Sequence, residues 1–346
     1  MNRNLSPKDL ALVIGVSESS LKRWVDEGRL IASRTAGGHR RIALHEAIRF
    51  IRDTHQTLSR PELLGLTDLT SGPLSAVTSG AGEAALHKAL ENGQAEQARG
   101  LILAQYLAAR SFASVCDAGI AHSMHRIGEL WRHSDNGIVV EHRATEIVID
   151  SVHQVRATLP PAPVDAPVAL GAAAPGDPYI LPTLMAATTL LECGFRDVNM
   201  GPNLPFDAFI SAVRQYQPRL VWLAATHVDD RDGFLDGLAR LSRMTSEAGI
   251  TLALGGRAIY GLPRPELPGT HVVMSMSELA ALGRATKSQP MLAGVGGATF
   301  SGTAAGSISA PAGGATGLAG VRTREISGGS SNGNGVAVLG KARPKR

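Results

Sequence analysis

Three residues suited to holding a flat ligand lie close together near the middle of the chain. Trp131 precedes a short turn at Asn136-Gly137, and the adjacent pair Glu141 and His142 follows it. An aromatic ring offers a broad apolar surface, whereas a carboxylate and an imidazole offer hydrogen bonds and, for imidazole, a metal ligand. Two helices joined at this turn would present all three side chains at one end of a helical bundle. We predict that this stretch links the detection of a signal to its output.

Basic and hydroxyl side chains gather in the first fifty residues around a predicted helix and a glycine turn. The helix begins at Glu18 after a Ser17 cap, and the turn is Gly37-Gly38. Short donors beside cations at a helix N-terminus suit the major groove of DNA, and a glycine turn lets cations approach phosphate closely. The predicted DNA contacts are Ser19, Ser20, Lys22, Arg23, Arg34, His39, Arg40 and Arg41. The alternative is a small helical domain with a solvated basic face.

Charge is unevenly distributed along the 346 residues. Residues 1–60 carry 11 Lys or Arg against 6 Asp or Glu, and residues 286–346 carry 7 against 1. Basic ends around an acidic middle indicate a polyanion partner for the ends. Only two cysteines, Cys116 and Cys193, are present, and no apolar run reaches the roughly 18 residues that cross a bilayer. We therefore expect a protein of the reducing bacterial cytoplasm, associated with the nucleoid and not with a membrane.

The elements that must position these residues follow from caps, breaks and apolar periodicity, and they predict a multidomain α and α/β protein. Residues 1–55 contain two helices, a turn between short β-like segments and a third helix, and the mixed composition of 56–80 predicts a linker. Helical periodicity with three breaks predicts a four-helix bundle over 81–160. Strands alternating with helices predict a Rossmann-like, flavodoxin-like parallel sheet over 164–285, with ligands beyond the carboxyl ends of its strands. The Gly/Ala/Ser-rich, basic residues 286–346 are expected to be disordered.

Residues 5–55 resemble the winged helix-turn-helix of the MerR family, in particular its shorter excisionase-like variants. The residues that carry the resemblance are Leu21-Lys22-Arg23-Trp24, Gly28-Arg29-Leu30 and the run from Arg34 to Ile42. The resemblance implies binding to double-stranded promoter or operator DNA through the second helix and the wing. Because one such module buries little surface, we expect a homo-oligomer, either a dimer or a tetramer.

Residues 83–285 resemble the cobalamin-binding module of methionine synthases and corrinoid proteins. The resemblance rests on Asp117, Ile127-Gly128, Trp131, Ile138 and Glu141-His142 in the bundle, and on Gly201–Pro205 and Leu254–Arg257 in the α/β part. It implies a ligand sandwiched between bundle and sheet, with Trp131, Glu141 and His142 on its upper face. On the α/β side it implies contacts from Tyr179, Asn203, Thr226, His227, Gly255 and Gly256.

A cobalamin-binding module behind a MerR-type reader is similar to the light-sensing, adenosylcobalamin-dependent repressors of the CarH/LitR type. That resemblance implies that the protein is a transcriptional regulator and not an enzyme. Because the similar proteins are repressors, we expect a repressor. It also implies that oligomers assemble on DNA in the dark. Light then breaks the cobalt–carbon bond and releases the DNA.

The chain departs from this family at the cobalt ligands. The family's lower axial ligand is a histidine in the loop after the first strand, and Tyr179 stands in its place. A neutral phenol is a poorer donor to cobalt than an imidazole. The family's third-strand serine is absent, with Thr226 the nearest hydroxyl, and Arg132 replaces the histidine that follows the bundle tryptophan. His133 and His227 are therefore the less favoured candidates for a replacement metal ligand.

Three interpretations of the pocket follow. Adenosylcobalamin binds without a protein lower ligand, keeping its own base or none. Alternatively, another tetrapyrrole, a haem or a linear bilin, has taken the pocket, and tyrosine is a known ligand of ferric haem. In the third interpretation the pocket is empty and the domain only oligomerises, under the control of a partner. A corrinoid methyltransferase module is the alternative from a different class, but the loss of the lower histidine argues against it.

Overall fold

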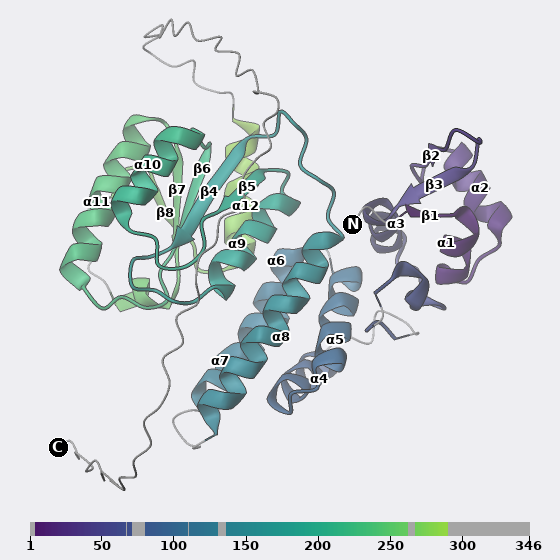
Figure 1. Ribbon diagram of the computed structural model, residues 1–346, viewed down its shortest axis with the longest axis horizontal. Coiled ribbons are helices and arrows are strands. Elements are labelled where there is room, and N and C mark those ends of the chain that lie inside the picture. The colour runs from purple at the N-terminus through teal and green to yellow at the C-terminus, as the bar shows by residue number, and fades with distance from the viewer. Residues whose placement is uncertain are drawn as a thin grey trace, which may run out of the picture. The chain divides into compact units, whose positions relative to one another are not determined.

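The computed structural model describes residues 4–66, 68–70, 80–109, 111–130, 136–261 and 267–289 (Figure 1). Three predictions therefore concern positions outside the described residues: the ligand contact Trp131, the metal-ligand candidate His133 and the disorder of residues 290–346. Within the described part of the chain, no helix is both long enough and apolar enough to cross a membrane.

The first two helices begin where the sequence supplies side-chain caps. Helix α1 (Pro7–Ile14) starts at Ser6, whose hydroxyl accepts from the Asp9 N–H at 3.1 Å, while the Asp9 carboxylate accepts from the Ser6 N–H at 3.1 Å. Helix α2 (Glu18–Asp26) starts at Ser17, whose hydroxyl accepts from the amide three residues further on at 3.2 Å. These caps satisfy amides that a helix N-terminus leaves free. Both helices therefore form from local signals, as predicted.

A three-stranded antiparallel sheet of order β1-β3-β2 completes the N-terminal unit, together with helix α3. These elements are β1 Asn4–Leu5, β2 Ser33–Arg34, β3 Arg40–Ala43 and α3 Leu44–Thr54. The β2–β3 hairpin turns through Gly38, whose φ of 79° is open to glycine without a steric cost. Phe50 of α3 packs on Trp24 of α2 with ring centroids 5.2 Å apart, so α2 and α3 share a core.

The predicted linker is a packed segment over its described residues, which corrects the expectation from composition. Residues Pro61–Leu64 form the 3-10 helix η1, and the Ser59 N–H donates to the Val13 carbonyl of α1 at 2.7 Å. Further on, the Asp68 carboxylate accepts from Arg99 Nε at 2.8 Å. Proline and glycine signalled turns here, but the leucines between them are core residues. The buried ones are Leu58, Leu64 and Leu69.

Four helical stretches follow, separated at the breaks that the sequence predicts (Figure 1). They are α4 Gly80–Glu91, α5 Ala95–Ala108, the run of α6 Phe112–Val115, η3 Cys116–Ala121 and α7 His122–Leu130, and finally α8 Gly137–Ala157. They pack together as a bundle. The middle of the third stretch, η3, is a π-helix, a form that occurs as short inserts in α-helices, frequently at functional sites.

The α/β part is a five-stranded parallel sheet of order β5-β4-β6-β7-β8, which confirms the flavodoxin-like prediction. Its strands are β4 Val168–Ala173, β5 Arg196–Asn199, β6 Leu220–Ala224, β7 Thr251–Gly255 and β8 Thr270–Val272. Its helices are α9 Leu181–Glu192, α10 Phe206–Tyr216, α11 Arg231–Glu247 and α12 Met276–Ser288, and a 3-10 turn η4 spans Arg257–Gly261.

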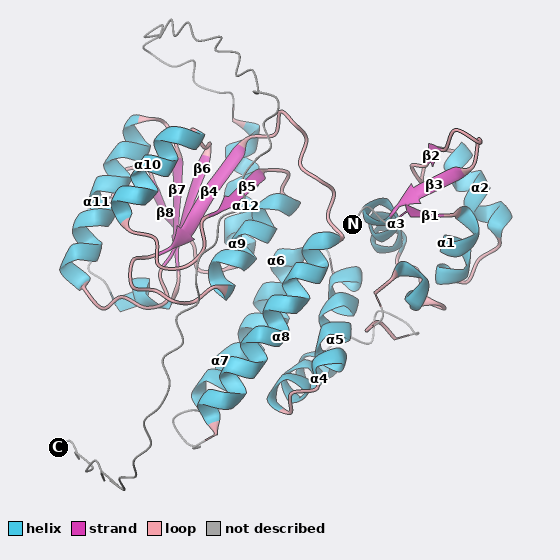
Figure 2. Ribbon diagram, viewed as in Figure 1, coloured by secondary structure: helices cyan, strands magenta, loops and turns pink. Residues whose placement is uncertain are grey.

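Helices cover both faces of this sheet (Figure 2). Helices α10 and α11 pack on one face through side chains such as Phe209 and Leu241, and α9 and α12 pack on the other through Leu190 and Leu279. The first turns of α9 also belong to the core of the bundle, through Leu181, Leu184 and Met185. Helix α9 is therefore shared between the bundle and the sheet.

The predicted start of the tail, residue 286, is wrong. Helix α12 continues to Ser288, and Thr286 is a buried residue whose hydroxyl donates to the Thr251 hydroxyl at 3.3 Å. Because Thr251 belongs to β7, this contact attaches the last turn of α12 to the sheet.

Candidate functional site

A cavity of about 490 Å³ opens at the carboxyl ends of β6, β7 and β8, where the bundle meets the α/β part. Ligands of parallel sheets sit beyond the carboxyl ends of the strands, and pockets for small molecules have volumes of this order. The lining is mostly apolar. It consists of Cys116, Asp117, Ala121 and His125 from the bundle and of Pro182, Met185, Ala186, Trp222, Leu223, Ala224, Ala253, Gly255, Gly256, Arg257, Tyr260, Val273, Met274, Ser275, Met276 and Leu279 from the α/β part.

Asp117 joins the bundle to the α/β part at this cavity. Its carboxylate, carried by η3, accepts from the Met276 N–H at 2.8 Å and from the Ser277 N–H at 2.9 Å. These are N-terminal amides of α12, where negative charge is favoured. The Ser275 hydroxyl accepts from the Glu278 N–H at 3.1 Å. The start of α12 therefore has one cap from its own segment and a second cap from the bundle.

The predicted contacts Gly255 and Gly256 lie in the cavity wall at the end of β7. A Cβ at Gly255 would lie 3.2 Å from the Val273 carbonyl oxygen, and a Cβ at Gly256, whose φ is 114°, would overlap the backbone of Ala225. Gly256 is therefore required by the close approach of neighbouring strand ends, and a side chain at Gly255 would be tightly packed. Their backbone, rather than a side chain, forms this part of the wall.

Trp222 is a wall residue that the sequence analysis did not single out. Its indole covers Gly171 of β4, where a Cβ would overlap the ring. The indole Nε1 donates to Thr183 Oγ1 at 2.9 Å, and the Thr183 hydroxyl donates to Asn199 Oδ1 at 2.9 Å. A buried chain of hydrogen bonds therefore fixes the orientation of the ring. The sequence signal that could have pointed to Trp222 is a single tryptophan in a predicted strand, while β4, the adjacent strand, consists mostly of alanine and glycine.

The loop after β4 is held by a buried carboxylate. Asp177 accepts from the backbone N–H groups of Tyr179 at 3.0 Å, Thr226 at 2.6 Å and His227 at 3.3 Å. Tyr179 itself is 40% exposed and lies outside the cavity lining. This loop is thereby tied to the loop after β6, and the residue predicted to face the lower side of a ligand is a half-exposed phenol.

The remaining predicted contacts on the α/β side surround this loop rather than line the cavity. The side-chain oxygen of Asn203 accepts from the Gly176 N–H at 2.7 Å. The His227 imidazole meets the Asp229 carboxylate at 2.6 Å, and both groups are exposed. Thr226 contributes its backbone N–H to Asp177. Among the described residues, no group of three or more His, Cys, Asp and Glu side chains could hold a metal ion.

Glu141 and His142 lie in the first turns of α8, where Glu141 is half-buried and His142 is exposed. Neither lines the cavity, whose bundle wall contains Asp117 and His125 instead. The structure therefore does not bring Glu141 and His142 together with the glycines of β7.

A second concave surface lies between the starts of α1 and α2 and the β2–β3 hairpin. Its lining is Ser6, Pro7, Lys8, Glu18, Lys22, Arg34, Gly38, His39, Arg40 and Arg41. We call it the basic groove. It brings together five of the eight predicted DNA contacts. Of its cations, Lys8, Arg34 and Arg41 form no ion pair with any residue in the described ranges, and Lys22 pairs with Glu18 at 2.9 Å.

Arg40, one of the predicted DNA contacts, is already paired with a carboxylate within the protein. It forms an ion pair with Asp26 at the end of α2, and its side chain is only 22% exposed. This pair fixes the hairpin to α2. On the outer side of α2, the hydroxyls of Ser19 and Ser20 share hydrogen bonds with Ser17, at 2.8 and 3.0 Å. The last predicted contact, Arg23, lies 3.7 Å from Glu27.

The helical bundle matches a known protein family. Residues 83–155, which comprise most of α4 to α8, match the family model described as "B12 binding domain". The chain contains a B12-binding domain. No curated protein matches the chain.

Several solved structures are similar to the chain that carries this B12-binding domain. The monomethylamine corrinoid protein of Methanosarcina barkeri is 16% identical, with 58% of this chain and 95% of that chain covered and a TM-score of 0.43. The methanol:cobalamin methyltransferase complex MtaBC of the same organism is 15% identical, with 61% and 82% covered and a TM-score of 0.30. A cobalamin-binding protein of Desulfitobacterium hafniense DCB-2 is 16% identical, with 62% and 94% covered and a TM-score of 0.30.

The residues around the cavity fit one side of a corrinoid and not the other. The apolar wall and the glycine backbone at the end of β7 accommodate a flat or apolar group of the ligand. The loop after β4 offers no imidazole to cobalt, because Tyr179 stands there, and the imidazole of His227 in the loop after β6 is engaged by Asp229. A corrinoid in the B12-binding domain would therefore rely on its own lower base or have none.

Proposed function

We propose that this protein is a DNA-binding transcriptional regulator, a repressor, whose binding to DNA is controlled by a corrinoid ligand, adenosylcobalamin. The observation that carries the proposal is a shared core. One continuous hydrophobic cluster includes Leu10 and Ile48 of the N-terminal unit, Ile102 and Val148 of the bundle and Met185 at the cavity. A ligand-binding part and a basic groove that share one core are able to influence each other.

The N-terminal unit supports the DNA-binding half of the proposal. Helix α2 follows α1 after a short turn, and the β2–β3 hairpin stands beside it, the arrangement expected of a winged helix-turn-helix. We assign α2 to the major groove and the hairpin to the adjacent phosphates. Lys8, Arg34 and Arg41 then supply charge to phosphate without first giving up an ion pair.

Fluorescence anisotropy with a labelled duplex, titrated at several salt concentrations, tests this half. Arg41→Ala should weaken binding at every sequence and lower the slope of log K against log salt by about one. Arg214→Ala, which removes an exposed arginine from α10, is the matched control and should leave the slope unchanged. An unchanged slope in Arg41→Ala would remove the hairpin from the interface.

The ligand half is tested by absorption spectra of the protein with added adenosylcobalamin, in the dark and after illumination. We expect a bound corrinoid in the dark, and a spectral change with loss of DNA binding after light. A haem or a bilin purified with the protein would give a different spectrum and replace adenosylcobalamin as the ligand. If adenosylcobalamin does not bind and no chromophore is present, the partner-controlled alternative is favoured.

The regulator is proposed to act as a homo-oligomer, a dimer or a tetramer, without catalytic activity of its own. Light scattering during gel filtration measures the mass with and without ligand. If the complex with DNA contains only one protein chain, the proposal that the regulator binds DNA as an oligomer is contradicted.

A further inference from the structure

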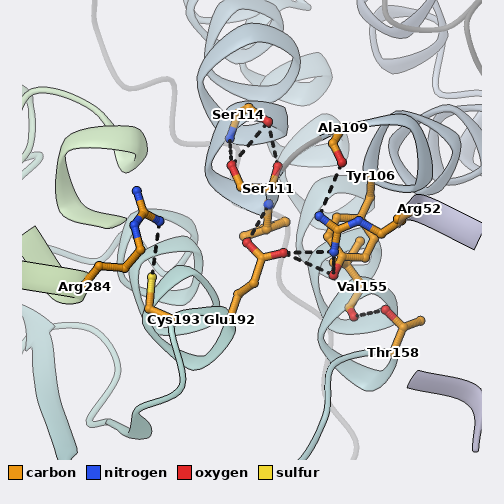
Figure 3. Close-up of polar contacts among 11 residues, drawn as sticks. Arg52, Tyr106, Ala109, Ser111, Ser114, Val155, Thr158, Glu192, Cys193 and Arg284 are labelled. Atoms are coloured by element: carbon orange, nitrogen blue, oxygen red, sulfur yellow. Dashed lines mark hydrogen bonds and ion pairs between the residues drawn. The ribbon is translucent and has the colours of Figure 1, made fainter. Parts of the chain in front are cut away.

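Three parts of the chain meet at the side chain of Glu192, the last residue of α9 (Figure 3). Its Oε1 accepts from Arg52 Nη1 of α3 at 3.2 Å and from the Tyr106 hydroxyl of α5 at 3.3 Å. Its Oε2 accepts from the Phe112 N–H, the first amide of α6, at 2.7 Å. One carboxylate therefore contacts the N-terminal unit, the bundle and the sheet-covering helix that carries it.

The contacts at this junction are largely shielded from water. The Arg52 and Glu192 side chains are 16% and 19% exposed. The Arg52 guanidinium lies over the Tyr106 ring, 4.3 Å from its centroid, and donates to the Ala109 carbonyl at 3.4 Å and to the Tyr106 hydroxyl at 2.8 Å. Burial strengthens such a pair electrostatically and makes the loss of one partner costly. The junction therefore holds the C-terminal turn of α3 in place.

Two helices connect the cavity to this carboxylate. Helix α9 lines the cavity with Met185 and reaches Glu192 seven residues later, about 10 Å along its axis. The run of α6 and η3 begins at Phe112 and lines the cavity with Asp117 five residues later, about 7 Å away. Each of these helices is therefore a continuous path of one or two turns from the cavity to Glu192.

We infer that Glu192 couples occupation of the cavity to the N-terminal unit, by changing its hold on Arg52 and hence the position of α3. The inference rests on the proposed function for what the N-terminal unit does with this signal. From α3 the path continues to α2, because Phe50 packs on Trp24. A ligand that moves α9 or η3 thus alters the helix assigned to the major groove.

Hydrogen exchange in the full-length protein tests the junction without DNA or ligand. Glu192→Gln removes the charge and keeps the shape, and the amides of residues 44–54 should then exchange about tenfold faster. Glu247→Gln is the matched control, since Glu247 is also the last residue of its helix and is exposed, and its side chain has no hydrogen bond or ion pair to any described residue. Glu192→Ala should have the larger effect. Unchanged exchange in α3 in both Glu192 variants would overturn the inference.

The second measurement is the ratio of DNA dissociation constants with and without adenosylcobalamin. Glu192→Gln should bring this ratio toward one, whereas Glu247→Gln should keep the wild-type ratio. Faster exchange in α3 with a wild-type ratio would refute the signalling role. If the ratio is already one in the wild-type protein, adenosylcobalamin does not affect DNA binding and the proposed function fails. The exchange rates then still decide whether Glu192 holds α3.

Discussion

Replacing Asp117 should weaken the attachment of the bundle to the α/β part. In Asp117→Ala, the Met276 and Ser277 amides at the start of α12 lose the carboxylate that accepts from both. Hydrogen bonds to charged groups contribute about 1.5–3 kcal/mol each to stability. Ser277 is exposed, so its freed amide bonds to water, whereas Met276 is half-buried. We therefore expect a loss of about 2.5 kcal/mol, which is within the range for one such bond and below the sum for two.

Urea unfolding followed by far-UV circular dichroism measures this loss. With a slope of about 3 kcal/mol per molar urea, the midpoint of the transition that includes α12 should fall by about 0.8 M. Asp117→Asn keeps one acceptor oxygen and should lose about 1 kcal/mol. Asp165→Ala removes an exposed carboxylate before β4 and serves as the control. A midpoint within 0.1 M (roughly the error of such a titration) in Asp117→Ala would refute the proposed attachment.

Three further predictions concern the interior and the C-terminal end. Trp222→Phe should lower the free energy of unfolding in urea by about 2 kcal/mol, because it leaves a void beside Gly171 and removes the indole N–H bond to Thr183. A decrease below about 0.5 kcal/mol, which is the effect of a surface substitution, would contradict this packing. Burial raises the pKa of the Cys193 thiol, so less thiolate is present at neutral pH than in a free cysteine. Iodoacetamide should therefore label it slowly at pH 7 and faster as the pH rises through the raised pKa, as read by mass spectrometry; labelling at the rate of a free thiol would be inconsistent with the fold. Ending the chain after Gln289 should leave the thermal midpoint within about 2 °C of the full-length protein, whereas ending it before Thr286, a buried residue of α12, should lower it.

Local signals predicted the elements of this fold well. The caps at Ser6 and Ser17 depend on residues three positions apart, so they are visible in a short window of sequence. The parallel sheet with helices on both faces follows from the alternation of strands and helices along the chain. The prediction of a linker after α3 was wrong, because the leucines between the turn residues of this segment are buried in the core.

The site was harder to predict because its contacts join distant parts of the chain. Asp117 reaches amides 159 and 160 positions away, and Arg52 reaches a carboxylate 140 positions away. No periodicity reports such pairs. The π-wound turn that aims Asp117 is likewise invisible in sequence, since its residues have the same apolar spacing as an α-helix. The glycines of β7 were predicted from the resemblance to the cobalamin-binding module, whereas the orientation of Trp222 depends on hydrogen bonds to distant residues and was not predicted.

The helical run of η3 and α7 contacts the cavity with one stripe of side chains and the core of the bundle with an adjacent stripe. Asp117, Ala121 and His125 recur every four residues along the cavity wall, whereas Ile120 and Ile127 point into the bundle core. Substitutions at Ala121 and His125, both exposed, change the shape and polarity of the wall without touching the packing that holds the helices together. Ligand preference in such a protein can therefore diverge during evolution, or be redesigned, one side chain at a time while the scaffold stays the same.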